Sequence, residues 1–221
     1  MERPKVPEFQ AVILENPVVA VLIVDDARDA VPLAEALVAG GVRSMELTLR
    51  TDAALEALAA IKKGVPEMTA GVGTVIFPEQ VRPIVDAGAD FAVAPGFSRG
   101  VVEAALTLGL PFAPGIATPS DVEAALPFGF RVLKFYPAEA MGGLPYLSAM
   151  TAPYRHLGLS FVPLGGVNPG NLKEYLGSPL IAAVGGSWIA KRELIRAKDW
   201  ETIRRNASEA TALAASAEEE E

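Results

Sequence analysis

Short apolar runs rich in β-branched residues alternate with Ala- and Leu-rich segments of helical period along almost the whole chain, and few folds accommodate such a pattern. Eight runs have the character of strands: residues 18–24, 44–49, 68–72, 91–94, 112–114, 132–136, 160–164 and 181–184. Segments of helical period lie between them, including residues 30–39, 53–62, 78–87, 99–108 and 120–126. The pattern predicts an α/β fold with parallel strands, because helical crossovers connect parallel neighbours.

Eight strand and helix units in 221 residues favour a compact (β/α)8 TIM barrel, with a doubly wound open sheet as the alternative. An additional N-terminal helix is expected near residues 9–15 and a C-terminal helix near residues 200–215. No linker or shift of composition divides the chain, so residues 1–216 are expected to form one barrel domain. Residues 217–221, one Ala followed by four Glu, are expected to form an acidic disordered tail.

Composition excludes several classes of protein. The net charge of −8 argues against nucleic-acid binding, although much of it lies in the acidic tail. No apolar run reaches membrane length, and the first residues lack the layout of a signal peptide, so no membrane contact and a cytoplasmic location are expected. The absence of cysteine excludes thiolate chemistry, and the single histidine, His156, lies in a turn-rich context without a second histidine to form a ligand pair. We therefore expect no metal and no cofactor.

Lys134 differs from the other six lysines, which stand in polar, helical or terminal contexts. Apolar residues flank it in the run 132–136, and the period of two in a strand places Val132, Lys134 and Tyr136 on one face. If that face lines the barrel, the amine is desolvated, which disfavours its charged form. A neutral amine can attack a carbonyl and form a Schiff base. The alternative is a lysine at a strand end that reaches solvent, which is commoner for lysines in general.

The second strand supplies possible partners for this lysine. Polar residues alternate with apolar ones there, which predicts that Ser44, Glu46, Thr48 and Arg50 point into the barrel. Glu46 and Arg50 either form a structural ion pair or act separately, with Arg50 as a clamp for a substrate carboxylate and Glu46 as a proton relay. On the third strand the same reasoning brings the hydroxyl of Thr74 to the same rim.

Two glycine pairs follow the last two strands, at Gly165-Gly166-Val167 and Gly185-Gly186-Ser187. These are the positions at which (β/α)8 barrels commonly bind phosphate through backbone N–H groups and a helix N-terminus. The alternative is a pair of tight turns without a ligand. Two such pairs at these two strands favour a phosphate site.

Several segments, in this order along the chain, together carry a family resemblance: Glu46-Leu47-Thr48-Leu49-Arg50-Thr51, Gly73-Thr74-Val75, Ala94-Pro95-Gly96, Pro114-Gly115-Ile116-Ala117-Thr118-Pro119, Leu133-Lys134-Phe135-Tyr136-Pro137-Ala138-Glu139 and Gly185-Gly186-Ser187-Trp188. The chain resembles the 2-keto-3-deoxy-6-phosphogluconate (KDPG) / 4-hydroxy-2-oxoglutarate (KHG) aldolase family of class I bacterial aldolases. The resemblance covers most of the chain.

This resemblance implies that Lys134 forms the imine, that Glu46 is the acid and base, and that Arg50 and Thr74 hold the pyruvate carboxylate. It also implies that Pro95 and Tyr136 shape the pocket, that the phosphate is received by Gly165, Gly166, Gly186 and Ser187, and that the protein is a homotrimer of barrels. Three positions depart from the family pattern, one of them Phe77, which takes a place often held by a polar residue. Leu164 replaces a threonine that meets the C4 region of the substrate, and Tyr136 replaces the second phenylalanine of the lysine motif.

The reaction implied is reversible cleavage of KDPG to pyruvate and D-glyceraldehyde 3-phosphate, with cleavage of KHG to pyruvate and glyoxylate as a further candidate. An aldolase for the galactonate epimer is one alternative. The others are a metal-dependent pyruvate aldolase, an isomerase or synthase on another phosphate-binding barrel, and a metabolite-binding barrel without catalysis.

Overall fold

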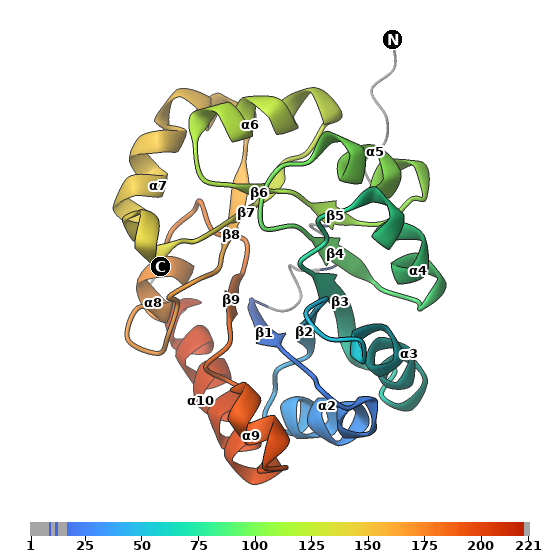
Figure 1. The fold of residues 1–221 in the computed structure, drawn as a ribbon. Helices are drawn as coiled ribbons and strands as arrows, with labels where there is room; N and C mark the ends of the chain where they lie inside the picture. The colour runs from blue at the N-terminus through green and yellow to red at the C-terminus, as the bar shows by residue number, and fades with distance from the viewer. Residues whose placement is uncertain (1–8, 10–11, 13–16, 219–221) are drawn as a thin grey trace.

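The computed structural model describes residue 9, residue 12 and residues 17–218. Parallel strands in its centre form a curled sheet, and helices surround the strands on the outside (Figure 1). The strands are β1 (Val18–Leu22), β2 (Ser44–Thr48), β3 (Thr69–Gly73), β4 (Phe91–Val93), β5 (Phe112–Ala113), β6 (Gly115–Ile116), β7 (Val132–Phe135), β8 (Ser160–Pro163) and β9 (Val184–Gly186).

The helices connect successive strands, as the sequence pattern predicted. They are α2 (Ala30–Ala39), α3 (Ala54–Gly64), α4 (Val81–Asp86), α5 (Arg99–Thr107), α6 (Pro119–Ala125), α7 (Gly143–Thr151), α8 (Leu172–Leu176), α9 (Arg192–Arg196) and α10 (Trp200–Glu218). Short 3-10 helices supplement them at η1 (Ala27–Asp29), η2 (Pro78–Gln80), η3 (Leu126–Phe128), η4 (Glu139–Met141) and η5 (Ala152–Leu157). No described helix is both long enough and apolar enough to cross a membrane.

The strand order excludes the doubly wound alternative. Six strands pair in the order β5-β4-β3-β2-β1-β9, and three pair in the order β6-β7-β8, all of them parallel. The first strand therefore lies between the second and the last, whereas a doubly wound sheet reverses direction near its middle. The parallel α/β fold predicted from the sequence is confirmed as a curled sheet in which neighbours follow chain order.

The two sheets approach each other at two seams. Pro114 separates β5 from β6, and its carbonyl oxygen accepts a hydrogen bond from the N–H of Lys134 at 3.0 Å. At the other seam the N–H of Phe161 donates to Leu180 at 2.8 Å, and the N–H of Ala182 donates to Phe161 at 2.9 Å. Backbone hydrogen bonds therefore connect β8 with the segment that leads into β9.

The last strand does not lie where the sequence predicted it. We expected residues 181–184, but β9 spans Val184–Gly186, and Ile181 makes only an isolated bridge to Phe161. Its two glycines pair with β1 in a regular ladder. They fit there because a Cβ on Gly185 would lie 2.7 Å from Leu164, so the strand has no room for a side chain at that point. Glycine pairs usually mark turns, which is why the sequence was misleading here.

The C-terminal helix also differs from expectation at its end. Helix α10 continues to Glu218, and Ala217 is buried, whereas the sequence placed residues 217 and 218 in a disordered tail. Its buried alanines recur at helical spacing, at Ala207, Ala210, Ala214 and Ala217. Residues 219–221 lie outside the described residues, as does most of the expected N-terminal helix, of which only Phe9 and Val12 are described, both helical.

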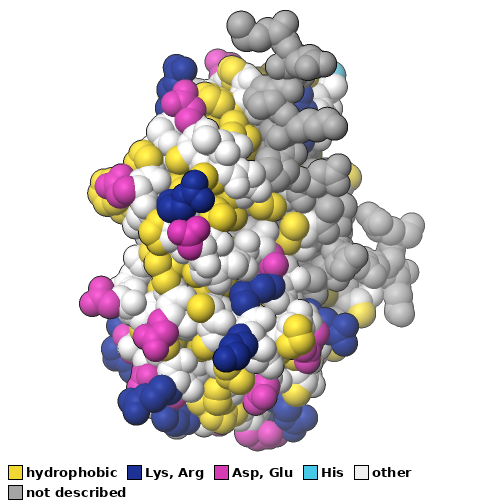
Figure 2. Space-filling view, turned by 90° about the vertical axis from the view of Figure 1, so that its right-hand side faces the viewer, with side chains coloured by type: hydrophobic (Ala, Val, Ile, Leu, Met, Phe, Trp, Pro, Cys, Tyr) yellow, Lys and Arg dark blue, Asp and Glu magenta, His cyan; other side chains and the backbone are white. Residues whose placement is uncertain are grey.

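The interior of the curled sheet is filled by side chains. Phe9 packs there edge-to-face on Phe91, with ring centroids 5.5 Å apart, beside Val19, Val93 and Val132. Outside the strands, a second and larger core joins them to the helices. The surface over α3 and α4 carries acidic and basic side chains interspersed with one another (Figure 2). That face has no extended basic patch of the kind that nucleic-acid binding requires.

Candidate active site

A pocket of about 270 Å³ opens at the carboxyl ends of the strands, the end at which α/β barrels carry their active sites. The catalytic, carboxylate-binding, pocket and phosphate-binding residues that the sequence predicted all line this pocket: Lys134, Glu46, Arg50, Thr74, Pro95, Tyr136, Leu164, Gly165, Gly166, Gly186 and Ser187. Thr48 and the remaining residues of the two glycine segments, Val167 and Gly185, line it as well. The residues that line the pocket thus come from seven strands or from the loops that directly follow them.

Lys134 and Glu46 form a buried ion pair at the centre of this pocket. The Nζ of Lys134 donates to both carboxylate oxygens of Glu46, at 3.0 Å and 3.2 Å. Only 5% of Lys134 and 3% of Glu46 is exposed, so the lysine does not reach bulk solvent. The ring of Tyr136 lies 5.9 Å from the same Nζ and adds a weak cation–π contact. The partner of Glu46 is therefore Lys134, and the alternative of a structural pair between Glu46 and Arg50 is wrong.

This pair has a chemical consequence, because buried charges are retained only where a partner compensates their desolvation. Transfer of one proton from the amine of Lys134 to the carboxylate of Glu46 neutralises both groups at once, without moving net charge through the interior. A neutral amine is then available as a nucleophile in contact with its own acid. The arrangement supports carbonyl chemistry at Lys134.

Glu46 lies directly against the backbone of Gly73 on the neighbouring strand β3. A Cβ built on Gly73 would lie 1.7 Å from Oε1 of Glu46 and 2.4 Å from its Cδ. No real side chain tolerates such an approach. Gly73 is thus the residue that leaves room for the carboxylate next to Lys134.

Replacing Gly73 by alanine is expected to lower kcat by roughly 10²–10⁴-fold, because the added methyl group must displace the Glu46 carboxylate from Lys134. Steady-state kinetics measures the loss. Gly96→Ala is the matched control, since a Cβ there meets nothing within 4 Å, and it should leave kcat within about twofold of the parent. A Gly73→Ala enzyme as active as the Gly96→Ala enzyme would show that the placement of Glu46 does not limit the reaction.

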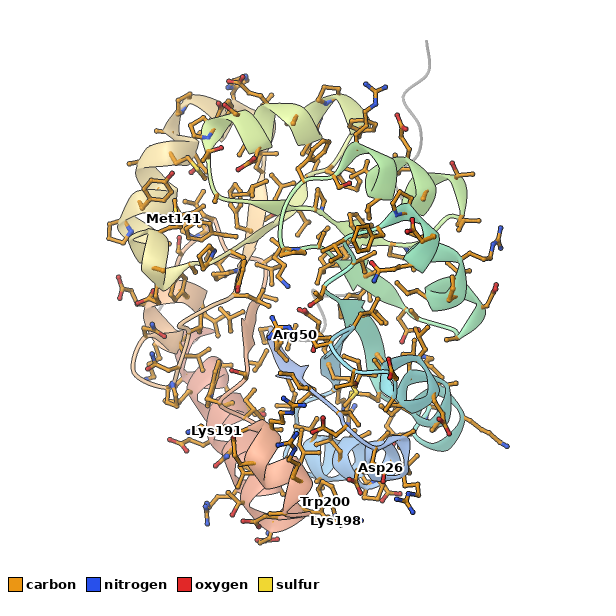
Figure 3. All side chains as sticks on the ribbon, in the orientation of Figure 1. Asp26, Arg50, Met141, Lys191, Lys198 and Trp200 are labelled. Atoms are coloured by element: carbon orange, nitrogen blue, oxygen red, sulfur yellow. The ribbon has the colours of Figure 1, made fainter. Side chains whose placement is uncertain are left out.

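Arg50 and Thr74 lie at the rim of the pocket with polar groups free. Arg50 is exposed and points to the centre of the ring of strands, and within the described part of the chain it forms no ion pair or hydrogen bond (Figure 3). The hydroxyl of Thr74 likewise has no partner among the described residues, whereas that of Thr48 donates to Leu22 at 2.9 Å. A guanidinium and a hydroxyl without partners suit a planar carboxylate ligand.

The backbone of Thr74 is held in an unusual conformation. Its φ is 64°, in the left-handed region that residues with a branched Cβ rarely adopt. Backbone hydrogen bonds fix both sides of it, from the N–H of Leu49 to Gly73 at 3.0 Å and from the N–H of Val75 to Val93 at 3.3 Å. Local strain of this kind persists where the surrounding structure determines it, and it is common at functional sites.

The two glycine segments present backbone donors to the pocket. Within the described residues, the N–H groups of Gly165, Gly166, Val167 and Ser187 have no acceptor. Gly165 and Gly166 have positive φ values of 91° and 100°, which glycine adopts without strain. Backbone donors gathered in this way suit an anion, because each N–H otherwise lacks a hydrogen bond.

The walls of the pocket are largely apolar. Tyr136 and Leu164 face the ion pair from β7 and β8, as the sequence suggested. Val21 and Ile23 also line the pocket, and the sequence did not single them out. Val21 lies in β1 and Ile23 follows it. This strand has no polar residues, so no contrast of polar and apolar positions marked its inner face. The strand pairing in the structure, which places Val21 opposite Glu46, is what reveals that Val21 lies on the inner face.

Two arginine side chains of α9 form ion pairs that connect parts of the fold and do not line the pocket. Arg192 and Arg196 of α9 both donate to Asp25, which follows β1, at distances of 2.9 Å and 2.7 Å from their Nε atoms. The hydrogen bond from Arg192, followed by that from Arg196, holds the pKa of Asp25 well below its ordinary value. The ion pairs join the loop after β1 to the helix that follows the Gly185-Gly186 segment.

The remaining candidate groups lie elsewhere. His156, which the sequence placed in a turn-rich context, is exposed in η5 and does not line the pocket. Lys62 and Lys198 pair with Asp90 and Asp29, outside the pocket. Among the described residues, no three His, Asp or Glu side chains lie together as possible metal ligands.

Comparison with known proteins gives one family. Residues 9–206 match the family model described as KDPG and KHG aldolase. The KHG/KDPG aldolase of Escherichia coli (strain K12) is 40% identical over 201 residues, which are 91% of this chain and 93% of that protein.

Solved structures agree with this match. The KDPG aldolase of Legionella pneumophila, with pyruvate captured as a covalent carbinolamine, is 40% identical and has a TM-score of 0.87, over 91% of this chain and 97% of that one. The Zymomonas mobilis enzyme with 3-phosphoglycerate is 38% identical and has a TM-score of 0.86, over 94% of this chain and 97% of that one. Both similarities extend over nearly the whole of either chain.

Proposed function

The chain belongs to the KDPG and KHG aldolase family, and from this premise we propose that it is a class I aldolase acting through a Schiff base on Lys134. It cleaves KDPG reversibly to pyruvate and D-glyceraldehyde 3-phosphate. The observation that carries the proposal is the buried contact between Lys134 and Glu46 inside a pocket with free cationic and N–H groups at its rim. A carbinolamine of pyruvate in the Legionella pneumophila enzyme supports the same chemistry.

The first half of the reaction forms the imine. Glu46 takes a proton from the amine of Lys134, and the neutral Nζ attacks the C2 carbonyl carbon of the substrate. The attached nitrogen loses one proton as the carbonyl oxygen gains one, which gives a neutral carbinolamine with a hydroxyl on C2. Glu46, now protonated, gives its proton to this hydroxyl, which leaves as water, and an iminium links C2 to Nζ. At 3.0 Å from Nζ, Glu46 is close enough to serve each step directly or through one water.

The second half breaks the carbon–carbon bond. The carboxylate of Glu46 removes the proton of the C4 hydroxyl, and the electron pair of the C3–C4 bond moves toward the iminium nitrogen. The aldehyde leaves, and an enamine of pyruvate stays on Lys134. Glu46 returns its proton to C3, and water then hydrolyses the imine, which releases pyruvate and frees the amine.

The rim of the pocket orients the two ends of the substrate. Arg50 and the Thr74 hydroxyl hold the carboxylate next to C2. Both donors directly follow a strand, β2 or β3, and neither has a partner among the described residues. The phosphate lies at the other side, at Gly165, Gly166, Gly186 and Ser187, where the N–H groups of Gly165, Gly166 and Ser187 have no acceptor among the described residues. The 3-phosphoglycerate bound by the Zymomonas mobilis enzyme supports a phosphate-bearing ligand.

Relative turnover of three substrates tests this function. We expect kcat/KM for KDPG to exceed that for KHG by at least about tenfold, since only KDPG brings a phosphate to the glycine N–H groups. The galactonate epimer should be cleaved within roughly tenfold of KDPG, because Leu164 offers the C4 hydroxyl no hydrogen bond by which to distinguish it. Coupled assays of pyruvate release give all three values. If the protein cleaves none of the three substrates, the proposed function is refuted.

The architecture that we propose is one closed (β/α)8 barrel in a single domain, which continues through α10 to Glu218 rather than ending at residue 216. The hydrogen bonds at the two seams, around Pro114 and around Phe161, support closure of the two sheets into a single ring. We also propose a homotrimer, as the family resemblance implies. Ile76 and Phe77 support a subunit contact, since they are 44% and 54% exposed, which is unusual for large apolar side chains. The cytoplasmic location expected from the sequence stays a prediction.

A further inference from the structure

Three successive carbonyl groups in the pocket wall are held by donors outside the pocket lining. The oxygen of Leu164 accepts from the N–H of Ala138 at 2.8 Å. The oxygen of Gly165 accepts from the N–H of Glu139 at 2.9 Å. Neither donor residue lines the pocket, so these carbonyl groups are directed away from it.

The third carbonyl, that of Gly166, is held by two side chains. The amide nitrogens Nδ2 of Asn168 and Asn171 donate to it at 2.8 Å and 3.3 Å. The two asparagines are also hydrogen-bonded to each other, since the backbone N–H of Asn168 donates to Oδ1 of Asn171 at 2.8 Å. Both lie behind the pocket lining, on the stretch that leads into α8.

Because the peptide unit is planar, the direction of these three carbonyl groups determines the direction of the N–H groups that follow them. In a trans peptide unit the C=O and the N–H of the next residue point in opposite directions. Because the carbonyl groups of residues 164, 165 and 166 are fixed on the far side, the N–H groups of Gly165, Gly166 and Val167 are directed toward the pocket. All three lack an acceptor within the described chain. Three consecutive N–H groups of this kind form a concave anion site.

Glu139 and Tyr175 brace the same turn from behind. The Cβ and Cγ of Glu139 fill the space where a side chain on Gly166 would stand, 2.4 Å from its ideal Cβ. Oε1 of Glu139 accepts from the hydroxyl of Tyr175 at 2.5 Å. Tyr175 belongs to α8 and is only 2% exposed, and burial, followed by the hydrogen bond to Glu139, raises the pKa of its hydroxyl. The hydroxyl therefore stays protonated and continues to donate.

Glu139 begins the short helix η4, and Met141 ends it. Figure 3 labels Met141, which lies on the outer side of the strands, away from the central Arg50.

We propose that Asn168, Asn171, Glu139 and Tyr175 are positioning residues that fix the three N–H groups and thereby set the affinity for the substrate phosphate. They do not touch the reacting atoms at Lys134. The identity of the anion as the phosphate of the substrate rests on the proposed function, whereas the orientation of the N–H groups does not.

Two variants test the proposal, Tyr175→Phe and the double variant Asn168→Ala/Asn171→Ala. Removal of the two amide donors should raise KM for KDPG roughly tenfold, and Tyr175→Phe should raise it roughly threefold, while kcat stays within about twofold. For 2-keto-3-deoxygluconate, which lacks the phosphate, kcat/KM should not change. A positioning role predicts this split, whereas a general loss of structure would affect both substrates equally.

Tyr154→Phe is the matched control, because Tyr154 also donates to a glutamate, Glu123, at 2.8 Å but on the exposed surface outside the pocket. It should leave both substrates unaffected. A melting curve for each variant checks that the fold is retained.

Calorimetric binding of inorganic phosphate separates this inference from the proposed function. Weaker phosphate binding in both variants supports the positioning role even if the protein does not cleave KDPG. Unchanged phosphate binding, or an equal loss of kcat/KM for the phosphorylated and unphosphorylated substrates, overturns it. If the parent protein binds phosphate but does not cleave KDPG, the proposed function is refuted, whereas the positioning role is not.

Discussion

Replacing Lys134 by alanine is expected to lower kcat for KDPG cleavage by on the order of 10⁵-fold, because no other amine replaces it as the nucleophile. Lys134 is the only lysine that lines the pocket in the described chain, and its amine is held 3.0 Å from the acid that serves it. Single-turnover and steady-state assays of pyruvate release measure the loss.

Lys62→Ala is the matched control for this variant. Lys62 also contacts both oxygens of a carboxylate, that of Asp90 at 2.8 Å and 2.6 Å, but it lies outside the pocket. Its replacement should leave kcat within about twofold. If the Lys134→Ala enzyme kept more than about 1% of the parent kcat, with the fold verified by circular dichroism, the imine on Lys134 could not be the main route.

Replacing Glu46 by glutamine is expected to lower kcat by roughly 10²–10⁴-fold, the range typical for loss of a general acid and base. The amide keeps the shape of the carboxylate and its contact with Lys134, but it carries no proton between the amine, the carbinolamine and C3. Stability should fall as well, by up to about 3–5 kcal/mol, since the buried ammonium of Lys134 loses its counter-charge. Kinetics and chemical denaturation measure the two effects.

Glu103→Gln provides the comparison for Glu46→Gln. Glu103 pairs with Arg99 on the exposed surface of α5 at 2.8 Å, so its replacement should change neither kcat nor stability appreciably. Slower imine formation in the Glu46→Gln enzyme, observed as slower borohydride trapping of pyruvate, would locate the defect in proton transfer. A Glu46→Gln enzyme with the kcat of the Glu103→Gln enzyme would eliminate Glu46 as the acid and base.

The sequence predicted the active-site strands best where polar and apolar residues alternate. On β2 the alternation placed Ser44, Glu46, Thr48 and Arg50 toward the interior. The last three line the pocket, whereas Ser44 is buried outside its lining. The same rule failed on β1, where every residue is apolar and the inner positions Val21 and Ile23 carry no signal. Strand pairing, which places Val21 opposite Glu46, supplied the information that composition lacked.

The ion pair itself could not be derived from the sequence. Lys134 and Glu46 are 88 positions apart and come from strands on different sheets, so their distance depends on how the sheet curls. The sequence placed both groups at one mouth, but it left open whether Glu46 pairs with Arg50 or not. The boundaries of β9 and of α10 were misjudged for local reasons, since paired glycines resemble a turn and an acidic end resembles a disordered tail.

The sequence also could not show how the N–H groups of the Gly165-Gly166 turn are oriented. Gly165 and Gly166 are visible as a motif, whereas the direction of their N–H groups depends on carbonyl contacts with Glu139, Asn168 and Asn171. Those contacts join the segment after β7 to the loop between β8 and α8, and no spacing rule in the sequence predicts that pairing.

Borohydride reduction in the presence of pyruvate, followed by mass mapping of the peptides, tests the imine on Lys134 most directly. Reduction converts a Schiff base into a stable secondary amine, so the modified residue can be identified. The mechanism predicts one pyruvate-derived adduct per chain, on Lys134, and none in the Lys134→Ala variant. An adduct on any other lysine, or no adduct under turnover conditions, would contradict it.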